Sequence, residues 1–185
     1  EIAVKCSGIT KTFGGVVAND DINLEVKYGE ILALLGENGS GKTTLMNMLS
    51  GIYHPDKGTI AISGKTVAIN SPKDSIALGI GMIHQHFKLV EVFTAADNIV
   101  AGTKGSLKGK GAVRDEINKI SEQLGLEVDP DKKVYNMSVS EKQTVEILKV
   151  LYRGAKILIL DEPTAVLTPQ ETEKLFAILK KMKAQ

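Results

Sequence analysis

Tryptophan is absent from this 185-residue chain, and cysteine occurs once. The lone Cys6 cannot form a disulfide within the chain, which suits a reducing compartment. No apolar run approaches the roughly 18–20 residues that a membrane-spanning helix needs, so we expect any membrane role to be peripheral. Charge is also nearly balanced, since 23 basic and 22 acidic residues leave a net charge of +1. This balance excludes a global field that would attract nucleic acid.

The apolar residues that are present predict a folded α/β protein. Hydrophobic residues make up 43% of the chain, which is typical of a soluble domain and excludes disorder, collagen and coiled coil. Residues 2–9 and 16–26 alternate in the manner of β-strands. The runs 31–35 and 156–160 are almost wholly apolar, as expected of parallel strands buried on both faces. Because each of these two runs leads into a turn and a helix, we predict a parallel α/β core.

Local signals place the remaining elements. Ser138 and Glu141 form a capping box that starts one helix, and Thr168, Pro169 and Glu171 start another. The stretch from 94 to 136 is mostly helical in pattern and predicts a separate helical lobe. The other expected elements are a helix over 42–49, a hairpin at 63–64, a helix over 72–78 and a strand over 80–83.

A glycine-rich phosphate loop is the strongest motif. Residues Gly36–Thr44 match G-x-x-x-x-G-K-[ST] between a predicted buried strand and a predicted helix. The glycines allow successive N–H groups to face one anion, and the helix N-terminus adds its positive dipole end. Lys42 would neutralise the β- and γ-phosphates, and the Thr43 hydroxyl would ligate Mg²⁺. The predicted nucleotide-binding set is Gly36, Asn38, Gly39, Ser40, Gly41, Lys42, Thr43 and Thr44.

Two acids complete the predicted chemistry. Asp161 and Glu162 follow the apolar run 157–160, at the carboxyl end of a predicted strand, where ligands bind in open α/β sheets. Asp161 can reach the Mg²⁺ shell, and Glu162 can orient or deprotonate a water molecule. The pair therefore predicts nucleotide hydrolysis.

Three classes of phosphate-binding protein compete for this pattern. A GTPase needs N-K-x-D, whereas Asn118-Lys119-Ile120-Ser121 lacks the acid, and no D-x-x-G occurs. A small-molecule kinase usually has arginine-rich lids, but only two arginines are present. In contrast, the order of Gly36–Thr44, Gln85, Ser138 and Leu160-Asp-Glu-Pro163 resembles that of an ABC transporter ATPase. At residues 13–20, 82–87, 151–154 and 161–170 the sequence resembles that of the simple-sugar and nucleoside importers, and it resembles the nucleoside branch most.

The resemblance implies an α/β fold of the P-loop NTPase type with a RecA-like parallel core. It further implies an N-terminal antiparallel β subdomain and an inserted helical subdomain at about 92–140. The whole of 1–185 would then be a single ABC ATPase domain that is incomplete at its C-terminus. The family's switch histidine would lie beyond residue 185, so we expect this stretch alone to bind ATP with weak or no turnover.

The resemblance also assigns roles to single residues. Phe13 matches the aromatic residue that stacks on adenine. Gln85 matches the glutamine that contacts Mg²⁺ and the attacking water and relays to the membrane subunit. Ser138 matches the signature serine that faces the γ-phosphate held by an opposing cassette. The run Met137–Glu141 departs from the family's Leu-Ser-Gly-Gly-Gln, because side chains and a negative charge replace the two glycines and the glutamine.

The implied function is ATP hydrolysis coupled to import of a nucleoside or simple sugar through a membrane permease. The implied partners are a second cassette (a tandem half or a homodimer), the permease and, indirectly, an extracytoplasmic solute-binding protein, with no nucleic acid. The implied location of the chain is the cytoplasmic face of the cell membrane, as a peripheral protein. Two alternatives stay open, a cassette that binds ATP without hydrolysing it and a non-transport ABC ATPase. The second usually has long coiled-coil insertions, and none lies between Lys42 and Asp161.

Overall fold

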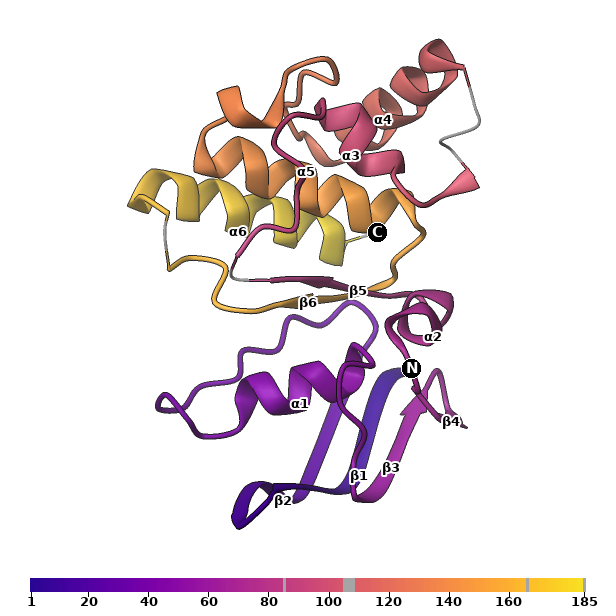
Figure 1. Ribbon diagram of the computed structural model, residues 1–185, viewed down its shortest axis with the longest axis vertical. Helices are drawn as coiled ribbons and strands as arrows, with labels where there is room; N and C mark the ends of the chain where they lie inside the picture. The colour runs from indigo at the N-terminus through magenta and orange to yellow at the C-terminus, as the bar shows by residue number, and fades with distance from the viewer. Residues whose placement is uncertain (85, 105–108, 166, 185) are drawn as a thin grey trace. The chain divides into compact units, whose positions relative to one another are not determined.

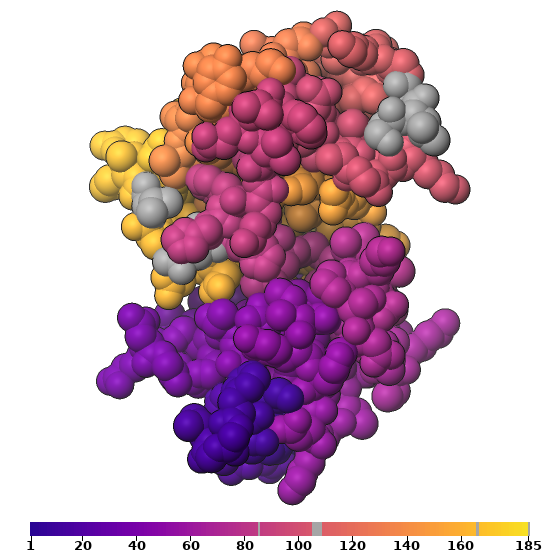
Figure 2. Space-filling view, in the orientation of Figure 1, coloured from indigo at the N-terminus to yellow at the C-terminus, as the bar shows by residue number. Residues whose placement is uncertain are grey.

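The computed structural model describes residues 1–84, 86–104, 109–165 and 167–184 (Figures 1 and 2). The chain forms two compact units, Glu1–Gly81 and Met82–Gln185. The helical subdomain predicted at about 92–140 lies within the sequence of the second unit, and its separation from the rest stays a prediction. Among the described helices, none has the length and apolar character to cross a membrane.

An antiparallel sheet dominates the first unit. Its strands are β1 (Ile2–Phe13), β2 (Val16–Lys27), β3 (Lys57–Ile62) and β4 (Lys65–Val67), in the order β2-β1-β3-β4. β1 and β2 form a hairpin in which Phe13 pairs with Val16. Val4, Cys6 and Ile9 of β1 are buried in the core, and Val4 and Cys6 pair with the buried Ile62 and Ile60 of β3. The predicted antiparallel β subdomain is therefore confirmed.

Two helices accompany this sheet. Helix α1 (Lys42–Leu49) has the predicted bounds and buries Leu45, Met48 and Leu49. Helix α2 (Pro72–Ala77) begins after Ser71, whose hydroxyl accepts a hydrogen bond from the Asp74 N–H. Proline at the first helical position suits this start, because its missing N–H would have no helical partner there.

The strand predicted at 31–35 is wrong. This segment is irregular, and no described strand pairs with it. A parallel strand forms only where a neighbour supplies the hydrogen-bond ladder. Within the first unit the four strands already pair with one another in antiparallel fashion, so this apolar run finds no parallel neighbour there.

The second unit combines a two-stranded parallel sheet with helices (Figure 1). Strand β5 (Ile80–Ile83), which starts at the end of the first unit, pairs with β6 (Ile157–Leu160), and the Asp161 N–H continues this pairing by donating to the Ile83 carbonyl. The core consists of apolar side chains from both strands and from the helices, including Ile99, Ile117 and Leu148. The helical elements are α3 (Ala95–Val100), α4 (Lys110–Leu124), η2 (Val134–Asn136), α5 (Val139–Tyr152) and α6 (Pro169–Lys183).

Both predicted capping boxes are confirmed. At the start of α5, the Ser138 hydroxyl accepts from the Glu141 N–H, and the Glu141 carboxylate accepts from the Ser138 N–H. Thr168 and Glu171 make the same reciprocal pair at the start of α6. These local signals hold because each cap satisfies helix-end donors that would otherwise lack partners.

Candidate nucleotide-binding site

The phosphate loop of the first unit curls around its own lysine. Lys42 Nζ donates to the carbonyl oxygens of Gly36 at 2.7 Å and Glu37 at 2.8 Å, and to Ser40 Oγ at 3.2 Å. The ammonium group therefore lies over the loop, where it would meet a bound phosphate. The role of Lys42 in neutralising phosphate charge stays a prediction of the motif.

Gly41 is the tightest point of this loop. Its φ is 87°, and an added Cβ would lie 2.2 Å from the Ala18 carbonyl oxygen, so no other residue fits. Asn19 approaches from the same side, and its Nδ2 donates to the Gly41 carbonyl at 3.2 Å. The Asn19 side chain is buried, with 6% of the residue exposed, and its Oδ1 has no hydrogen-bond partner. The motifs assign no role to Asn19, and its hydrogen bond joins β2 to the loop.

Phe13 lies at the tip of the β1–β2 hairpin and presents an accessible ring. The residue is 41% exposed, the Tyr53 ring meets it edge-on at 5.0 Å between centroids, and Lys11 Nζ lies 5.3 Å from its centroid. Lys11 thus lies over the ring, and the exposed part of the ring is the surface on which a planar base could stack. Tyr53 was not predicted to belong to this surface.

Asp56 fixes the strand end that carries Phe13. Its carboxylate forms an ion pair with Lys11 at 2.8 Å and accepts from both the N–H and the hydroxyl of Thr12 at 2.7 Å. The hydrogen bond from Lys11, followed by those from Thr12, lowers the pKa of Asp56 to about 2. The carboxylate is therefore charged at any physiological pH and can accept these hydrogen bonds from Lys11 and Thr12.

In the second unit, Asp161 and Glu162 follow β6 as predicted. Glu162 has a left-handed backbone with φ of 47°, a conformation that costs a non-glycine residue about 1–3 kcal/mol and is concentrated at functional sites. The turn is closed by the Ala165 N–H, which donates to the Glu162 carbonyl at 3.2 Å. Gln143 of α5 also holds this turn, since its Nε2 donates to the Pro163 carbonyl at 2.8 Å.

Gln85, the predicted partner of Mg²⁺ and the attacking water, lies outside the described residues. The segment that follows it is firmly held. The Lys88 N–H donates to Glu146 Oε1 at 2.8 Å, and the Val90 N–H donates to Asn98 Oδ1 at 2.7 Å.

Two of the side chains predicted to ligate Mg²⁺, Thr43 and Asp161, offer oxygen atoms, and their role as ligands stays a prediction. In the parts of the chain that the structure describes, no three His, Cys, Asp or Glu side chains gather into a metal-binding group. Mg²⁺ usually takes one or two carboxylates together with substrate phosphates and water, rather than an all-protein cage. The Thr43 hydroxyl on the first turn of α1 and the Asp161 carboxylate are hard oxygen donors of this kind.

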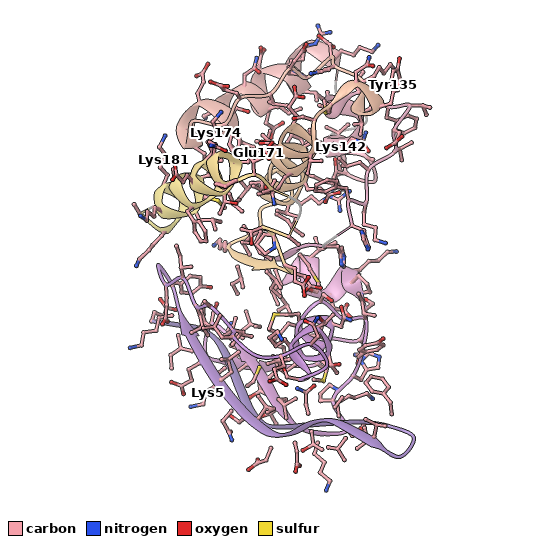
Figure 3. All side chains as sticks on the ribbon, turned by 90° about the vertical axis from the view of Figure 1, so that its left-hand side faces the viewer. Lys5, Tyr135, Lys142, Glu171, Lys174 and Lys181 are labelled. Carbon is pink, nitrogen blue, oxygen red and sulfur yellow. The ribbon has the colours of Figure 1, made fainter. Side chains whose placement is uncertain are left out.

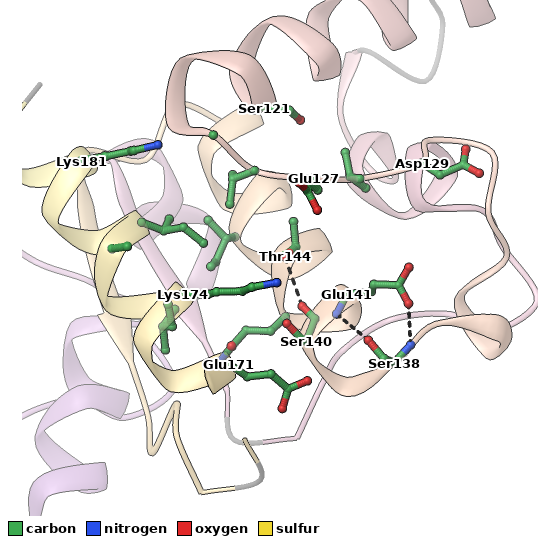
Figure 4. A pocket seen from close by; sticks show the side chains of 18 of the residues that line it. Ser121, Glu127, Asp129, Ser138, Ser140, Glu141, Thr144, Glu171, Lys174 and Lys181 are labelled. Carbon is green, nitrogen blue, oxygen red and sulfur yellow. Dashed lines mark hydrogen bonds between the residues drawn. The ribbon is translucent and has the colours of Figure 1, made fainter. Parts of the chain in front are cut away.

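Ser138 caps α5, as Figure 4 shows. The Glu141 carboxylate also accepts from Lys132 Nζ at 2.6 Å. This hydrogen bond, followed by the one from the Ser138 N–H, lowers the pKa of Glu141. The negative charge that departs from the family's signature is thus compensated by Lys132. Ser138, Ser140 and Glu141 line one side of an open pocket between α4, α5 and α6.

Comparison with known families decides the identity. The family model described as ABC transporter matches residues 19–165. The chain belongs to the ABC transporter family. This confirms the family expected from the phosphate loop, the Asp161–Glu162 pair and their spacing.

The curated relatives of this ABC cassette are import proteins. It is 52% identical to the guanosine import ATP-binding protein NupO of Bacillus subtilis over 98% of the chain and 36% of the relative. It is 51% identical to the nucleoside import ATP-binding protein NupA of Lactococcus lactis, over 98% of the chain and 37% of that relative. It is 46% identical to the ribose import ATP-binding protein RbsA 2 of Burkholderia ambifaria over 98% and 37%. The chain therefore spans little more than a third of the length of these relatives.

Solved structures of other ABC cassettes share its fold. The cassette MJ1267 in its ADP conformation matches with a TM-score of 0.88 and 27% identity, over all of this chain and 78% of that one. The cassette cbiO1 of Clostridium perfringens matches with a TM-score of 0.85 and 29% identity, over 100% and 74%. These matches confirm the predicted α/β fold of the P-loop NTPase type.

Proposed function

We propose that this cassette binds Mg·ATP and hydrolyses it to drive import of a nucleoside or simple sugar. The observation that carries the proposal is the phosphate loop, in which Lys42 lies over the loop carbonyls and Gly41 is packed against β2. The names of the relatives support an import function, and the guanosine and nucleoside import proteins, at 52% and 51% identity, are more similar to this chain than the ribose import protein named above, at 46%.

ATP would bind through two parts of the first unit. The N–H groups of the loop and the N-terminus of α1 would surround the phosphates, with Lys42 exchanging its loop oxygens for phosphate oxygens. The exposed part of the Phe13 ring would stack on the adenine ring. The proposed binding residues in the loop are Gly36, Asn38, Gly39, Ser40, Gly41, Lys42, Thr43 and Thr44.

Hydrolysis would require a bound metal ion and an oriented water molecule. Thr43, Asp161 and Gln85 would hold Mg²⁺, which when bound neutralises charge on the phosphates. Glu162 and Gln85 would orient a water molecule for in-line attack on the γ-phosphate. The left-handed backbone of Glu162 supports this role, because such strain is concentrated at functional sites.

A second cassette would complete the site. The cassette MJ0796 forms a dimer in a post-hydrolysis state bound to ADP and phosphate, and this chain matches it with a TM-score of 0.79 and 26% identity over 97% of this chain and 82% of that one. In a similar dimer, whether from a tandem half or a homodimer, Ser138 would face the γ-phosphate held by the opposing loop.

The permease would dock on an exposed apolar surface of the second unit, formed by Val90, Val92, Phe93 and Tyr135. Backbone hydrogen bonds join its two halves, since the Tyr135 N–H donates to the Glu91 carbonyl and the Val134 N–H to the Phe93 carbonyl. Tyr135 points outward in Figure 3. Docking there would hold the cassette on the cytoplasmic face of the membrane and link it indirectly to a solute-binding protein.

A cassette that binds ATP without hydrolysing it is the second candidate. Val139 is exposed at the first helical position of α5, where the family has glycine. A side chain there opposes close approach of the helix to a phosphate. Because these sites are shared, the effect would fall on the partner's phosphate loop rather than on Lys42.

Calorimetric titration of Mg·ATP into the full-length protein tests ATP binding. We expect saturable binding that weakens about 10- to 100-fold in Lys42→Ala, because charge-assisted hydrogen bonds to phosphate are lost. Lys65→Ala, on the β4 strand, is the matched control and should bind like the parent. Absence of binding, or equal binding by Lys42→Ala, would contradict the proposal.

A further inference from the structure

Helix α5 carries three polar side chains that hold two other segments of the second unit. Gln143, Glu146 and Lys149 are spaced three residues apart, so they lie along one side of the helix. Gln143 and Glu146 are buried, and Lys149 is largely buried. Buried polar groups are costly unless their hydrogen bonds are satisfied, so the partners of these three side chains are specific.

Gln143 holds the turn after β6. Its Nε2 donates to the Pro163 carbonyl at 2.8 Å, one residue beyond Glu162. Glu162 has φ of 47°, and a residue keeps a left-handed backbone only where its surroundings enforce it. The anchor from Gln143 is adjacent to this residue and fixes the direction of the chain as it leaves it.

Glu146 and Lys149 hold the backbone of Lys88 from both sides. The Lys88 N–H donates to Glu146 Oε1 at 2.8 Å, and Lys149 Nζ donates to the Lys88 carbonyl at 2.8 Å. The two side chains also form an ion pair at 3.6 Å. Lys88 is three residues after Gln85, so this pair fixes the chain that follows Gln85.

Asn98 of α3 holds the backbone of Val90, two residues after Lys88, in the same way. Its Oδ1 accepts from the Val90 N–H at 2.7 Å, and its Nδ2 donates to the Val90 carbonyl at 3.0 Å. Side chains of α3 and α5 thus make hydrogen bonds to the backbone of residues 88–90. In a β-sheet, the backbone of a neighbouring strand would make these hydrogen bonds. Such a segment is set by the positions of α3 and α5.

We propose that Gln143 and the Glu146–Lys149 pair are positioning residues for hydrolysis: through them, α5 sets the turn that carries Glu162 and the segment that follows Gln85. Since Ser138 caps α5, one helix connects the residue that would face the opposing cassette with both segments. This inference rests on the proposed function for its catalytic consequence, whereas the anchoring of the two segments rests on the contacts alone.

Steady-state hydrolysis and Mg·ATP affinity, measured on the full-length protein with its permease, separate positioning from binding. Gln143→Met and Glu146→Leu should each lower kcat about 10- to 100-fold, because small displacements of reacting groups have effects of this size. The dissociation constant for Mg·ATP should stay unchanged. Glu146→Gln should restore most of kcat, because its amide oxygen still accepts the Lys88 N–H. Thr144→Val, which removes a hydrogen bond to Ser140 within α5, is the matched control with the parent's kcat.

Amide hydrogen exchange provides a second measurement that does not depend on hydrolysis. Exchange of the Lys88 amide should accelerate at least tenfold in Glu146→Leu and should change little in Glu146→Gln or Thr144→Val. Parent-like kcat and exchange in Glu146→Leu would overturn the inference. No hydrolysis by the parent protein would overturn the proposed function and the catalytic role, while faster exchange would still uphold the anchoring.

Discussion

At Gly41 the phosphate loop has no room for a side chain, and the neighbouring buried amide of Asn19 contributes a hydrogen bond to the Gly41 carbonyl. Through this contact, Asn19 of strand β2 supports the loop that precedes helix α1. A hydrogen bond of this kind contributes about 0.5–1.5 kcal/mol, and leaving a buried partner unsatisfied costs more.

Asn19→Leu should therefore weaken Mg·ATP binding about three- to tenfold, as measured by calorimetry. Inorganic tripolyphosphate should lose affinity by the same factor, because the contact acts on the phosphates and not on the base. Asn23→Leu is the matched control, since the Asn23 amide contacts Gly8 and Asp21 instead of the loop. Unchanged affinity for tripolyphosphate in Asn19→Leu would show that this hydrogen bond does not support the loop.

Roles could be predicted for residues that belong to a sequence motif, whereas they could not be predicted for residues that act through a tertiary contact. Lys42 and the Asp161–Glu162 pair are recognisable because phosphate and magnesium chemistry fixes their type and spacing. Asn19 and Gln143 contact residues about 20 positions away, at Gly41 and Pro163, and no local pattern records such a pairing. Only the folded chain brings these partners together.

At the scale of elements, the caps were the most predictable features and the strand at 31–35 was the failure. A cap is decided by three or four adjacent residues, so Ser138 and Thr168 reveal helix starts directly. A buried parallel strand depends on neighbours elsewhere in the chain, and apolar character alone does not supply them.

The contribution of Glu141, at the start of α5, to the stability of the folded state depends on pH. Lys132 and the Ser138 N–H lower its pKa, so the charged carboxylate stabilises the folded state above the unfolded pKa of about 4.3. That contribution is lost as the pH falls through the lowered folded pKa. Glu141→Gln should thus unfold at lower urea concentration than the parent at pH 7, with the difference shrinking in acid below the unfolded pKa.

Glu173→Gln, an exposed change on α6, is the control for this measurement and should match the parent at each pH. A difference between Glu141→Gln and the parent that stays constant from neutral pH into acid would refute the assignment of the effect to the Glu141 charge.

At the scale of the whole molecule, this chain covers little more than a third of its curated relatives. Its composition and motifs were enough to predict the family and the fold class, because phosphate binding imposes a long and specific pattern. The transported solute could not be predicted from a cassette, since the groups proposed here contact ATP and neighbouring proteins rather than the solute.

The most direct test is uptake of labelled guanosine and ribose by vesicles that contain the full-length protein and its permease, with the solute-binding protein supplied, together with ATP hydrolysis in the same vesicles. We predict ATP-dependent uptake of one solute that stimulates hydrolysis, and loss of both activities in Glu162→Gln while Mg·ATP still binds. Uptake that persists in Glu162→Gln, or binding of ATP by the parent without any hydrolysis, would contradict the central claim that this cassette powers import.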